Sequence, residues 1–264
     1  MMKQPPILHA EISGSGSPVV LIHGYLATSQ YWEKLRLQLQ ATHTVISIDL
    51  LGFGKSPKPR LSRYDYPAQL ASITATLKQL NVNQPFILMG HSMGALLALR
   101  FARLYPAQVT KLLLTNMPIM LSKKEARREI YSTSLAYRFG LNPIGARIMW
   151  PLFRAVSHTS LFKRFAAKDS MANRHGFMFQ NTAASRLRSF RKIIVAAQTE
   201  ADLRAITMKT LIISGLHDRK IYLTNLMFMN LHKRFHDNVA LYYIDGAHHL
   251  PNTQVTQLAK LVRS

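Results

Sequence analysis

The stretch LMGHSMGA, residues 88–95, places a serine between two glycines at the end of an apolar run. The residues before Ser92 predict a buried strand, and the pattern of residues 95–106 predicts a helix. A chain that changes from strand to helix within five residues must turn sharply, often with a positive φ at the serine. Gly90 and Gly94 suit such a turn, since larger side chains would collide with the adjoining strand or helix. The stretch therefore predicts a serine nucleophile at the edge of a sheet.

Short apolar runs rich in β-branched residues alternate with helical patterns along much of the chain. The runs are 18–24, 44–50, 86–92, 109–116, 210–215 and 239–245, with a weaker one at 7–13, and the helical patterns are 28–40, 67–80, 95–106 and 255–264. Several runs are apolar at nearly every position, which is typical of strands buried on both faces of a parallel sheet. We predict an α/β fold with a mostly parallel sheet flanked by helices, and an antiparallel edge strand at 7–13.

The alternation stops between residues 118 and 207, where no strand pattern is evident and several helical patterns follow one another. We predict a helical insertion over 118–207 in a core formed by 1–117 and 208–264. The segment carries 16 Lys and Arg against 5 Asp and Glu. Its large apolar side chains suggest an apolar ligand; they are Met120, Met149, Trp150, Phe153, Phe162, Met178 and Phe179.

Composition favours a globular protein, because 48% of the 264 residues are hydrophobic and only 17% are charged. The absence of cysteine excludes disulfides and thiolate metal sites. The N-terminal residues lack the apolar stretch of a signal peptide, and nowhere do about 18 apolar residues run together. We therefore expect a cytoplasmic protein.

The net charge is +22, from 34 Lys and Arg against 12 Asp and Glu. A general solubility bias explains such a charge, and so does attraction to anionic membrane surfaces, nucleic acid or acidic substrates. No zinc-finger spacing, aromatic RNA-binding box or basic heptad region accompanies it. We expect weak attraction to anionic membrane surfaces and no specific nucleic-acid partner.

A serine hydroxyl needs a base that removes its proton and a carboxylate that orients the base. Two adjacent histidines, His248 and His249, follow the last expected strand, so either can reach the edge that carries Ser92. Asp218 follows the strand at 210–215 and is the expected acid, with Asp245 as the alternative.

Acyl transfer also needs hydrogen-bond donors for the oxyanion that forms at the attacked carbonyl. The backbone N–H of Met93, directly after the serine, is one expected donor. The other is the N–H of Tyr25 in the loop after the strand at 18–24, with Leu26 as the neighbouring alternative. Gly24 allows that loop to approach the serine closely, and we expect His23 to fix the loop by a hydrogen bond.

The order of these residues resembles that of the α/β-hydrolase superfamily. The matching motifs are His23-Gly24, the DLLGFGKS turn at 49–56, the Gly90–Gly94 elbow, Gly215-x-x-Asp218 and Gly246-x-x-His249. The resemblance implies the α/β-hydrolase fold with a helical cap, and a structural turn at 49–56. The base of the family usually falls three residues after that last glycine, so the resemblance selects His249 as the base.

The serine at the elbow sets the chain apart from relatives that use aspartate there, namely haloalkane dehalogenases and epoxide hydrolases. The resemblance therefore implies a serine hydrolase of the esterase or lipase type, which cleaves a small apolar carboxylic ester through an acyl-enzyme. Such an enzyme needs no metal or organic cofactor. The alternatives are a C–C bond or thioester hydrolase with the same triad, and a non-catalytic ligand receptor on the same fold.

Overall fold

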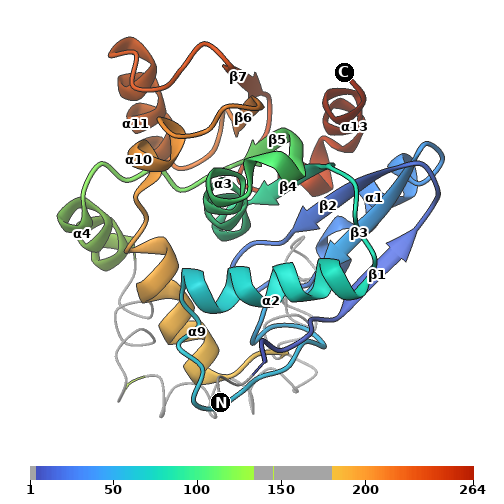
Figure 1. The fold of residues 1–264 in the computed structure, drawn as a ribbon. Coiled ribbons are helices and arrows are strands. Elements are labelled where there is room, and N and C mark those ends of the chain that lie inside the picture. The colour runs from blue at the N-terminus through green and yellow to red at the C-terminus, as the bar shows by residue number, and fades with distance from the viewer. Residues whose placement is uncertain (1–3, 134–144, 146–179) are drawn as a thin grey trace, which may run out of the picture.

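The computed structural model describes residues 4–133, 145 and 180–264. Its strands form one sheet in the order β1-β3-β2-β4-β5-β6-β7 (Figure 1). The strands are β1 (Ala10–Ser13), β2 (Ser17–Ile22), β3 (His43–Ile48), β4 (Phe86–His91), β5 (Val109–Thr115), β6 (Lys209–Gly215) and β7 (Val239–Ile244). β1 pairs antiparallel with β3, and every other neighbouring pair is parallel. The predicted α/β fold and the antiparallel edge strand are confirmed.

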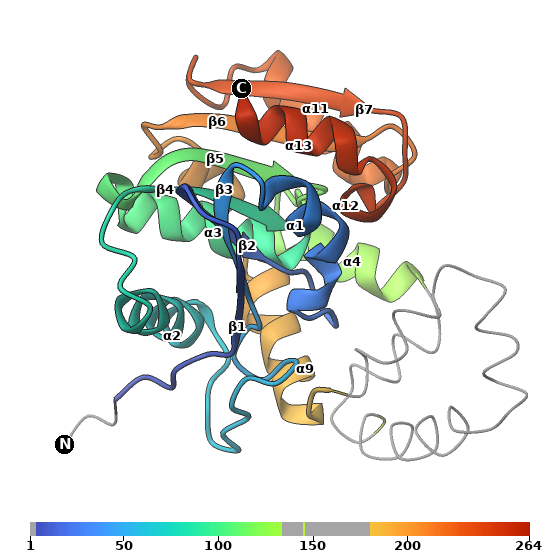
Figure 2. The same cartoon turned by 90° about the vertical axis from the view of Figure 1, so that its right-hand side faces the viewer.

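Helices cover both faces of the sheet. α2 (Tyr66–Gln79) and α3 (Met93–Leu104) lie on one face, whereas α1 (Glu33–Leu39) and α13 (Val255–Arg263) lie on the other (Figures 1 and 2). Asp65 caps α2 by accepting a hydrogen bond from the N–H of Ala68, so the helix begins at Tyr66, one residue before the predicted start. The sheet is therefore the middle layer of three.

The side chains of β2 illustrate why the strands read as continuous apolar runs. Val19 and Leu21 pack in the layer of α1 and α13, whereas Val20 and Ile22 pack in the layer of α2 and α3. All four are buried. Burying such a side chain stabilises the fold by about 1.5–3 kcal/mol, so both faces of this strand contribute to stability.

The described residues between β5 and β6 contain helices and no strand. They are α4 (Lys123–Thr133), α9 (Ala183–Ser189), the π-helical turn η3 (Phe190–Ile194) and α10 (Thr199–Leu203). Met120 is buried and packs with Ala126 and Tyr222. The other apolar residues expected to shape a ligand site here lie outside the described residues; they are Met149, Trp150, Phe153, Phe162, Met178 and Phe179. The cap boundaries at 118 and 207 stay a prediction.

The carboxyl ends of the parallel strands meet at one edge of the sheet, and the loops that follow them carry the polar residues singled out above. The loop after β6 leads into α11 (Lys220–Leu231), and the loop after β7 leads into α12 (Leu250–Thr253). None of the helices in the described part of the chain is long and apolar enough to cross a membrane.

Candidate active site

The turn between β4 and α3 holds Ser92 in a backbone conformation that few residues other than glycine adopt. Its φ is 53° and its ψ is −119°, which costs on the order of 1–3 kcal/mol and persists only where surrounding contacts impose it. A Cβ on Gly90 would collide with the backbone of Gly94, and a Cβ on Gly94 would collide with the carbonyl oxygen of Ile22. The two glycines therefore permit the turn, as the sequence predicts.

β5 holds this strained turn from the side. The N–H of Ser92 donates to the carbonyl oxygen of Thr115 at 2.9 Å. The hydroxyl of Thr115 donates in return to the carbonyl oxygen of Gly90 at 2.8 Å. These bonds fix the backbone on both sides of His91, so the position of the serine Oγ depends on the sheet and not on the loop alone.

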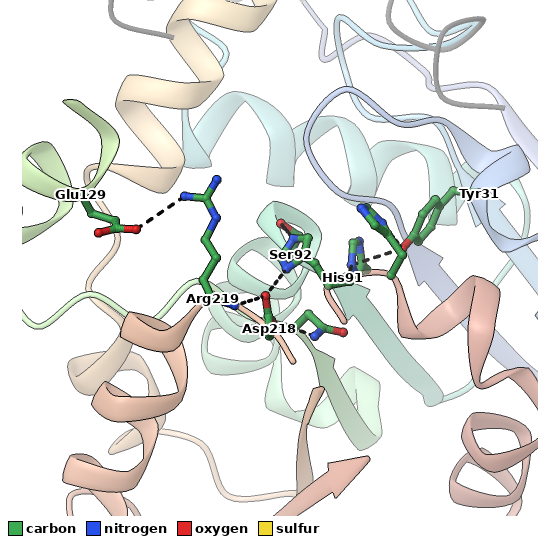
Figure 3. Close-up of polar contacts among 9 residues, drawn as sticks. Tyr31, His91, Ser92, Glu129, Asp218 and Arg219 are labelled. Atoms are coloured by element: carbon green, nitrogen blue, oxygen red, sulfur yellow. Dashed lines mark hydrogen bonds and ion pairs between the residues drawn. The ribbon is translucent and has the colours of Figure 1, made fainter. Parts of the chain in front are cut away.

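A histidine and an aspartate complete a relay with the serine. Ser92 Oγ lies 3.1 Å from His248 Nε2, and His248 Nδ1 lies 2.8 Å from Asp218 Oδ1 (Figure 3). A carboxylate only accepts hydrogen bonds, so Nδ1 carries the proton and Nε2 is left to accept the serine hydroxyl. A hydroxyl, an imidazole and a carboxylate thus lie in the order that general-base activation of a serine requires.

The predicted position of His249 in this relay is wrong. His249 Nδ1 lies 3.1 Å from the hydroxyl of Tyr31, in the segment that precedes α1, and the neighbouring His248 takes the place beside Ser92. The spacing rule counts residues after Gly246, but α12 begins directly after His249. The short loop therefore presents its first histidine to the serine and turns its second toward Tyr31.

The carboxylate of Asp218 has donors on both of its oxygens besides His248. Asn116 Nδ2 donates to Oδ2 at 2.8 Å, and the N–H of Arg219 donates to Oδ1 at 2.7 Å. Burial raises the pKa of this carboxyl, but the hydrogen bond and charge of His248, together with the other donors, outweigh burial and hold the pKa below its usual value. Asp218 therefore stays ionised, as the orienting acid must.

Asp245, the alternative acid, lies elsewhere. Its carboxylate is exposed and lies 2.9 Å from Nε2 of His217. Asn116 is a site residue that the sequence analysis did not name; its amide cannot replace the acid, because it carries no charge that stabilises an imidazolium. It follows β5 with a φ of 48° and serves the acid as a hydrogen-bond donor. Its place after a buried strand was the available signal.

The loop after β2 lies against the elbow. His23 is buried; its Nδ1 donates to the carbonyl oxygen of Gly24 at 2.7 Å, and its Nε2 accepts from the N–H of Leu50 at 2.9 Å. A Cβ on Gly24 would come within 3.1 Å of Ser92 Cβ. Tyr25, the expected oxyanion donor, is the next residue of this loop after Gly24.

Met93, the other expected donor, is the first residue of α3. Amides of the first helical turn have no acceptor within the helix and point toward its N-terminal end, where the helix dipole favours negative charge. The roles of Met93 and Tyr25 in binding an oxyanion stay predictions.

Behind the relay, His91 holds the backbone of the histidine loop. Its Nε2 lies 2.7 Å from the carbonyl oxygen of His248 and 3.2 Å from the hydroxyl of Tyr31. A carbonyl oxygen only accepts, so Nε2 carries the proton. Burial is the main cause that lowers the pKa of His91 well below its usual value, and the neighbouring histidines add to it. A neutral His91 therefore holds the backbone of His248 in place through this hydrogen bond.

On the other side of Ser92, Arg219 extends toward Glu129 of α4, with 3.8 Å between the guanidinium and the carboxylate (Figure 3). This contact joins the helical segment to the loop that carries Asp218. Among residues 4–133, 145 and 180–264, no three histidine, cysteine or acidic side chains are grouped so that they could hold a metal ion.

Comparison with known proteins identifies the family. A model of the alpha/beta hydrolase fold family matches residues 17–250, so the chain belongs to that family. A cis-3-alkyl-4-alkyloxetan-2-one decarboxylase of Shewanella oneidensis is 35% identical over 111 residues, which are 41% of this chain and 35% of that protein. A 2-hydroxy-6-oxo-2,4-heptadienoate hydrolase of Pseudomonas putida is 27% identical over 230 residues, 82% of this chain and 78% of that one.

A thermophilic esterase from Thermogutta terrifontis has a similar structure, with a TM-score of 0.71 at 23% identity over 97% of this chain and 91% of its own. This likeness shows the fold alone. The chain matches about a third of the length of the Shewanella relative. Family membership shows the alpha/beta hydrolase fold.

Proposed function

We propose that the protein is a serine hydrolase that cleaves carboxylic esters through an acyl-enzyme. The observation that carries this proposal is the relay of Ser92 Oγ, His248 and Asp218, with contacts of 3.1 and 2.8 Å. A binding protein has no need of a buried, ionised acid behind a histidine that contacts a strained serine. The relay therefore favours an enzyme over a ligand receptor.

In the first half of the reaction, Ser92 Oγ attacks the ester carbonyl while His248 Nε2 takes the hydroxyl proton. Asp218 holds the imidazole in the required tautomer and stabilises its charged form. The N–H groups of Met93 and Tyr25 then donate to the oxyanion, and the loss of one such donor costs about 10²–10³ in rate. His248 passes its proton to the leaving alcohol.

In the second half, water replaces the alcohol. His248 takes a proton from that water, the resulting hydroxide attacks the acyl carbonyl, and the acid product leaves as the proton returns to Ser92. The expected absence of a cofactor follows from this chemistry, because every proton transfer uses His248.

A second candidate is hydrolysis of a C–C bond by the same triad. The observation that favours it is the similarity over 82% of the chain to a hydrolase named for 2-hydroxy-6-oxo-2,4-heptadienoate. A substrate panel separates the two candidates.

The test is hydrolysis of p-nitrophenyl esters of increasing chain length, beside a thioester and a vinylogous diketone acid, by the protein and its Ser92→Ala variant. We expect ester turnover that the variant loses by roughly 10⁶ in kcat. The variant should keep its thermal unfolding midpoint or gain stability, since alanine removes only the hydroxyl. Ester turnover that survives in the variant would refute the assignment of Ser92, and turnover of the diketone acid alone would select the second candidate.

A further inference from the structure

The outer face of α4 carries a row of basic side chains. Lys123, Lys124, Arg127 and Arg128 are exposed, and none of them forms an ion pair with a residue that the structure describes. We propose that this face, the α4 basic face, docks on an anionic lipid bilayer. Three features favour a bilayer as the partner: the uncompensated charge of this face, the exposed side chain of Leu121 next to it, and the position of α4 near the loop that carries Asp218.

The acidic residues of the same helix point the other way. Glu125 accepts hydrogen bonds from the N–H of Leu121 at 2.6 Å and from Asn225 of α11 at 3.1 Å. Glu129 faces Arg219. Both carboxylates are thus used in contacts with the rest of the protein, and within the described part of the chain the basic residues of α4 have no acidic partner.

This arrangement opposes the stability of the helix itself. Lys123 with Arg127 and Lys124 with Arg128 are like charges four residues apart, which repel each other on a helix surface. The two lysines also lie in the first turn, where the helix dipole disfavours cations. An anionic surface relieves both costs, so the α4 basic face gains more from such a partner than an ordinary mixed-charge face does.

Two basic clusters elsewhere in the described chain are neutralised by shared carboxylates. Arg100 and Arg103 share Asp202, each with a contact of 2.7 Å, and Arg204 and Arg234 share Glu200. The positive charge of these four arginines is partly compensated, whereas that of the four basic residues of α4 is not compensated by any described acidic residue. The α4 basic face is a local concentration of positive charge.

Two features favour a bilayer over a soluble polyanion such as nucleic acid. Leu121, just before α4, has 43% of its surface exposed beside the lysines. An apolar side chain next to cations gains by entering the boundary between headgroups and acyl chains, and phosphate backbones offer it nothing comparable. α4 also contacts Arg219, next to Asp218, through Glu129 on its opposite face, so a bilayer on the α4 basic face lies one helix away from the loop that carries Asp218.

A bilayer in that place can supply an apolar ester, and this part of the inference rests on the proposed function. The docking itself does not. Binding is therefore measured on the full chain carrying Ser92→Ala, which cannot turn over an ester. If the variant does not bind vesicles, the proposed hydrolysis of soluble esters is unaffected. If the protein does not hydrolyse esters, the proposed docking is unaffected.

The test compares two triple variants in sedimentation with vesicles of phosphatidylcholine alone or mixed equally with phosphatidylglycerol. Lys124→Glu with Arg127→Glu and Arg128→Glu changes the α4 basic face. The matched control changes three exposed lysines on other elements, Lys78, Lys209 and Lys260, to Glu. Each triple lowers the net charge from +22 to +16, since three reversals remove six charges.

We expect binding to the anionic vesicles only, weakened by 0.5 M NaCl. A basic residue near an anionic surface contributes about fivefold in affinity, so the α4 triple should bind at least about 100-fold more weakly. The control triple should lose less than about tenfold. Both triples, with Ser92 restored, should hydrolyse a soluble ester as the unchanged chain does, which shows that they fold.

Equal losses in the two triples would overturn the proposal, because the attraction would then come from net charge alone. So would equal binding to vesicles without phosphatidylglycerol. Tighter binding of a short DNA duplex than of anionic vesicles at the same salt, lost in the α4 triple, would replace the bilayer with nucleic acid as occupant.

Discussion

The serine turn and the histidine loop supply two parts of one relay, but they are built in different ways. The turn is fixed by sterics within a few residues, because Gly90 and Gly94 are the residues that let Ser92 adopt a φ of 53°. The histidine loop has no such local determinant. Its two adjacent histidines are chemically equal, and contacts with Tyr31 and His91 decide their directions.

A sequence motif is sufficient to place a side chain only where its own residues fix the backbone. A motif whose residues collide unless they are small specifies its own geometry. Where a motif gives only the number of residues between a glycine and a functional side chain, the direction of that side chain depends on the path of the loop. His248 and His249 are an example, because contacts with Asp218, His91 and Tyr31 set their directions.

Replacing the two histidines separately should give the largest contrast. His248→Gln removes the group that takes the serine proton, so we expect kcat for ester hydrolysis to fall by roughly 10⁶. His249→Gln is the matched control and should lose less than tenfold, because this side chain contacts Tyr31 and not Ser92. Steady-state kinetics on a p-nitrophenyl ester measures both, and the reverse ranking would restore the spacing rule.

Asp218→Asn should have the next largest effect. The amide cannot stabilise a charged imidazole and allows the wrong tautomer, which costs about 10⁴ in kcat. Asp245→Asn serves as the control, since that exposed carboxylate contacts His217. Near-equal kcat values for the two variants would remove Asp218 from the acid role.

Variants of His91 test whether its hydrogen bond to the carbonyl oxygen of His248 affects the rate. His91→Phe keeps a ring but loses the donor to the carbonyl of His248, and misplacement of a reacting group by about 1 Å can cost about 10² in rate. We expect kcat to fall by that amount with KM nearly unchanged. His91→Gln, which retains a donor, should recover part of the loss; a Gln variant no better than Phe would assign His91 to packing alone.

The lowered pKa of His91 also predicts a dependence of stability on pH. In the unfolded chain a histidine binds a proton below about pH 6.5, whereas folded His91 resists protonation until a much lower pH. Its contribution is therefore fully present above about pH 6.5 and is lost as the pH falls, by about 1.4 kcal/mol per pH unit. Urea unfolding at pH 7, 6 and 5 should show a smaller loss in His91→Gln than in the unchanged chain. Parallel losses in the two would mean that His91 titrates normally.

Much of the fold could be predicted from the sequence, because apolar runs such as residues 18–24 and 86–92 can only be buried on both faces of a parallel sheet. Ser92 and Asp218 could be placed for the same reason, since each follows such a strand at the same edge. Those elements depend on local patterns and on the topology of parallel strands.

The remaining site residues depend on contacts between segments far apart in the sequence. Tyr31 and His249 are 218 residues apart, and Asn116 and Asp218 are 102 apart. No local pattern encodes such pairs. The direction of His248, and the use of Asn116 as a donor to the acid, therefore emerge only when the sheet brings the loops together.

If His248 activates Ser92, the rate at which a fluorophosphonate modifies the serine depends on that histidine. Mass spectrometry of the digested chain locates and times the adduct. We expect a single adduct on Ser92, formed at a similar rate in His249→Gln and slowed by several orders of magnitude in His248→Gln. An adduct on another residue, or fast labelling of Ser92 without His248, would contradict it.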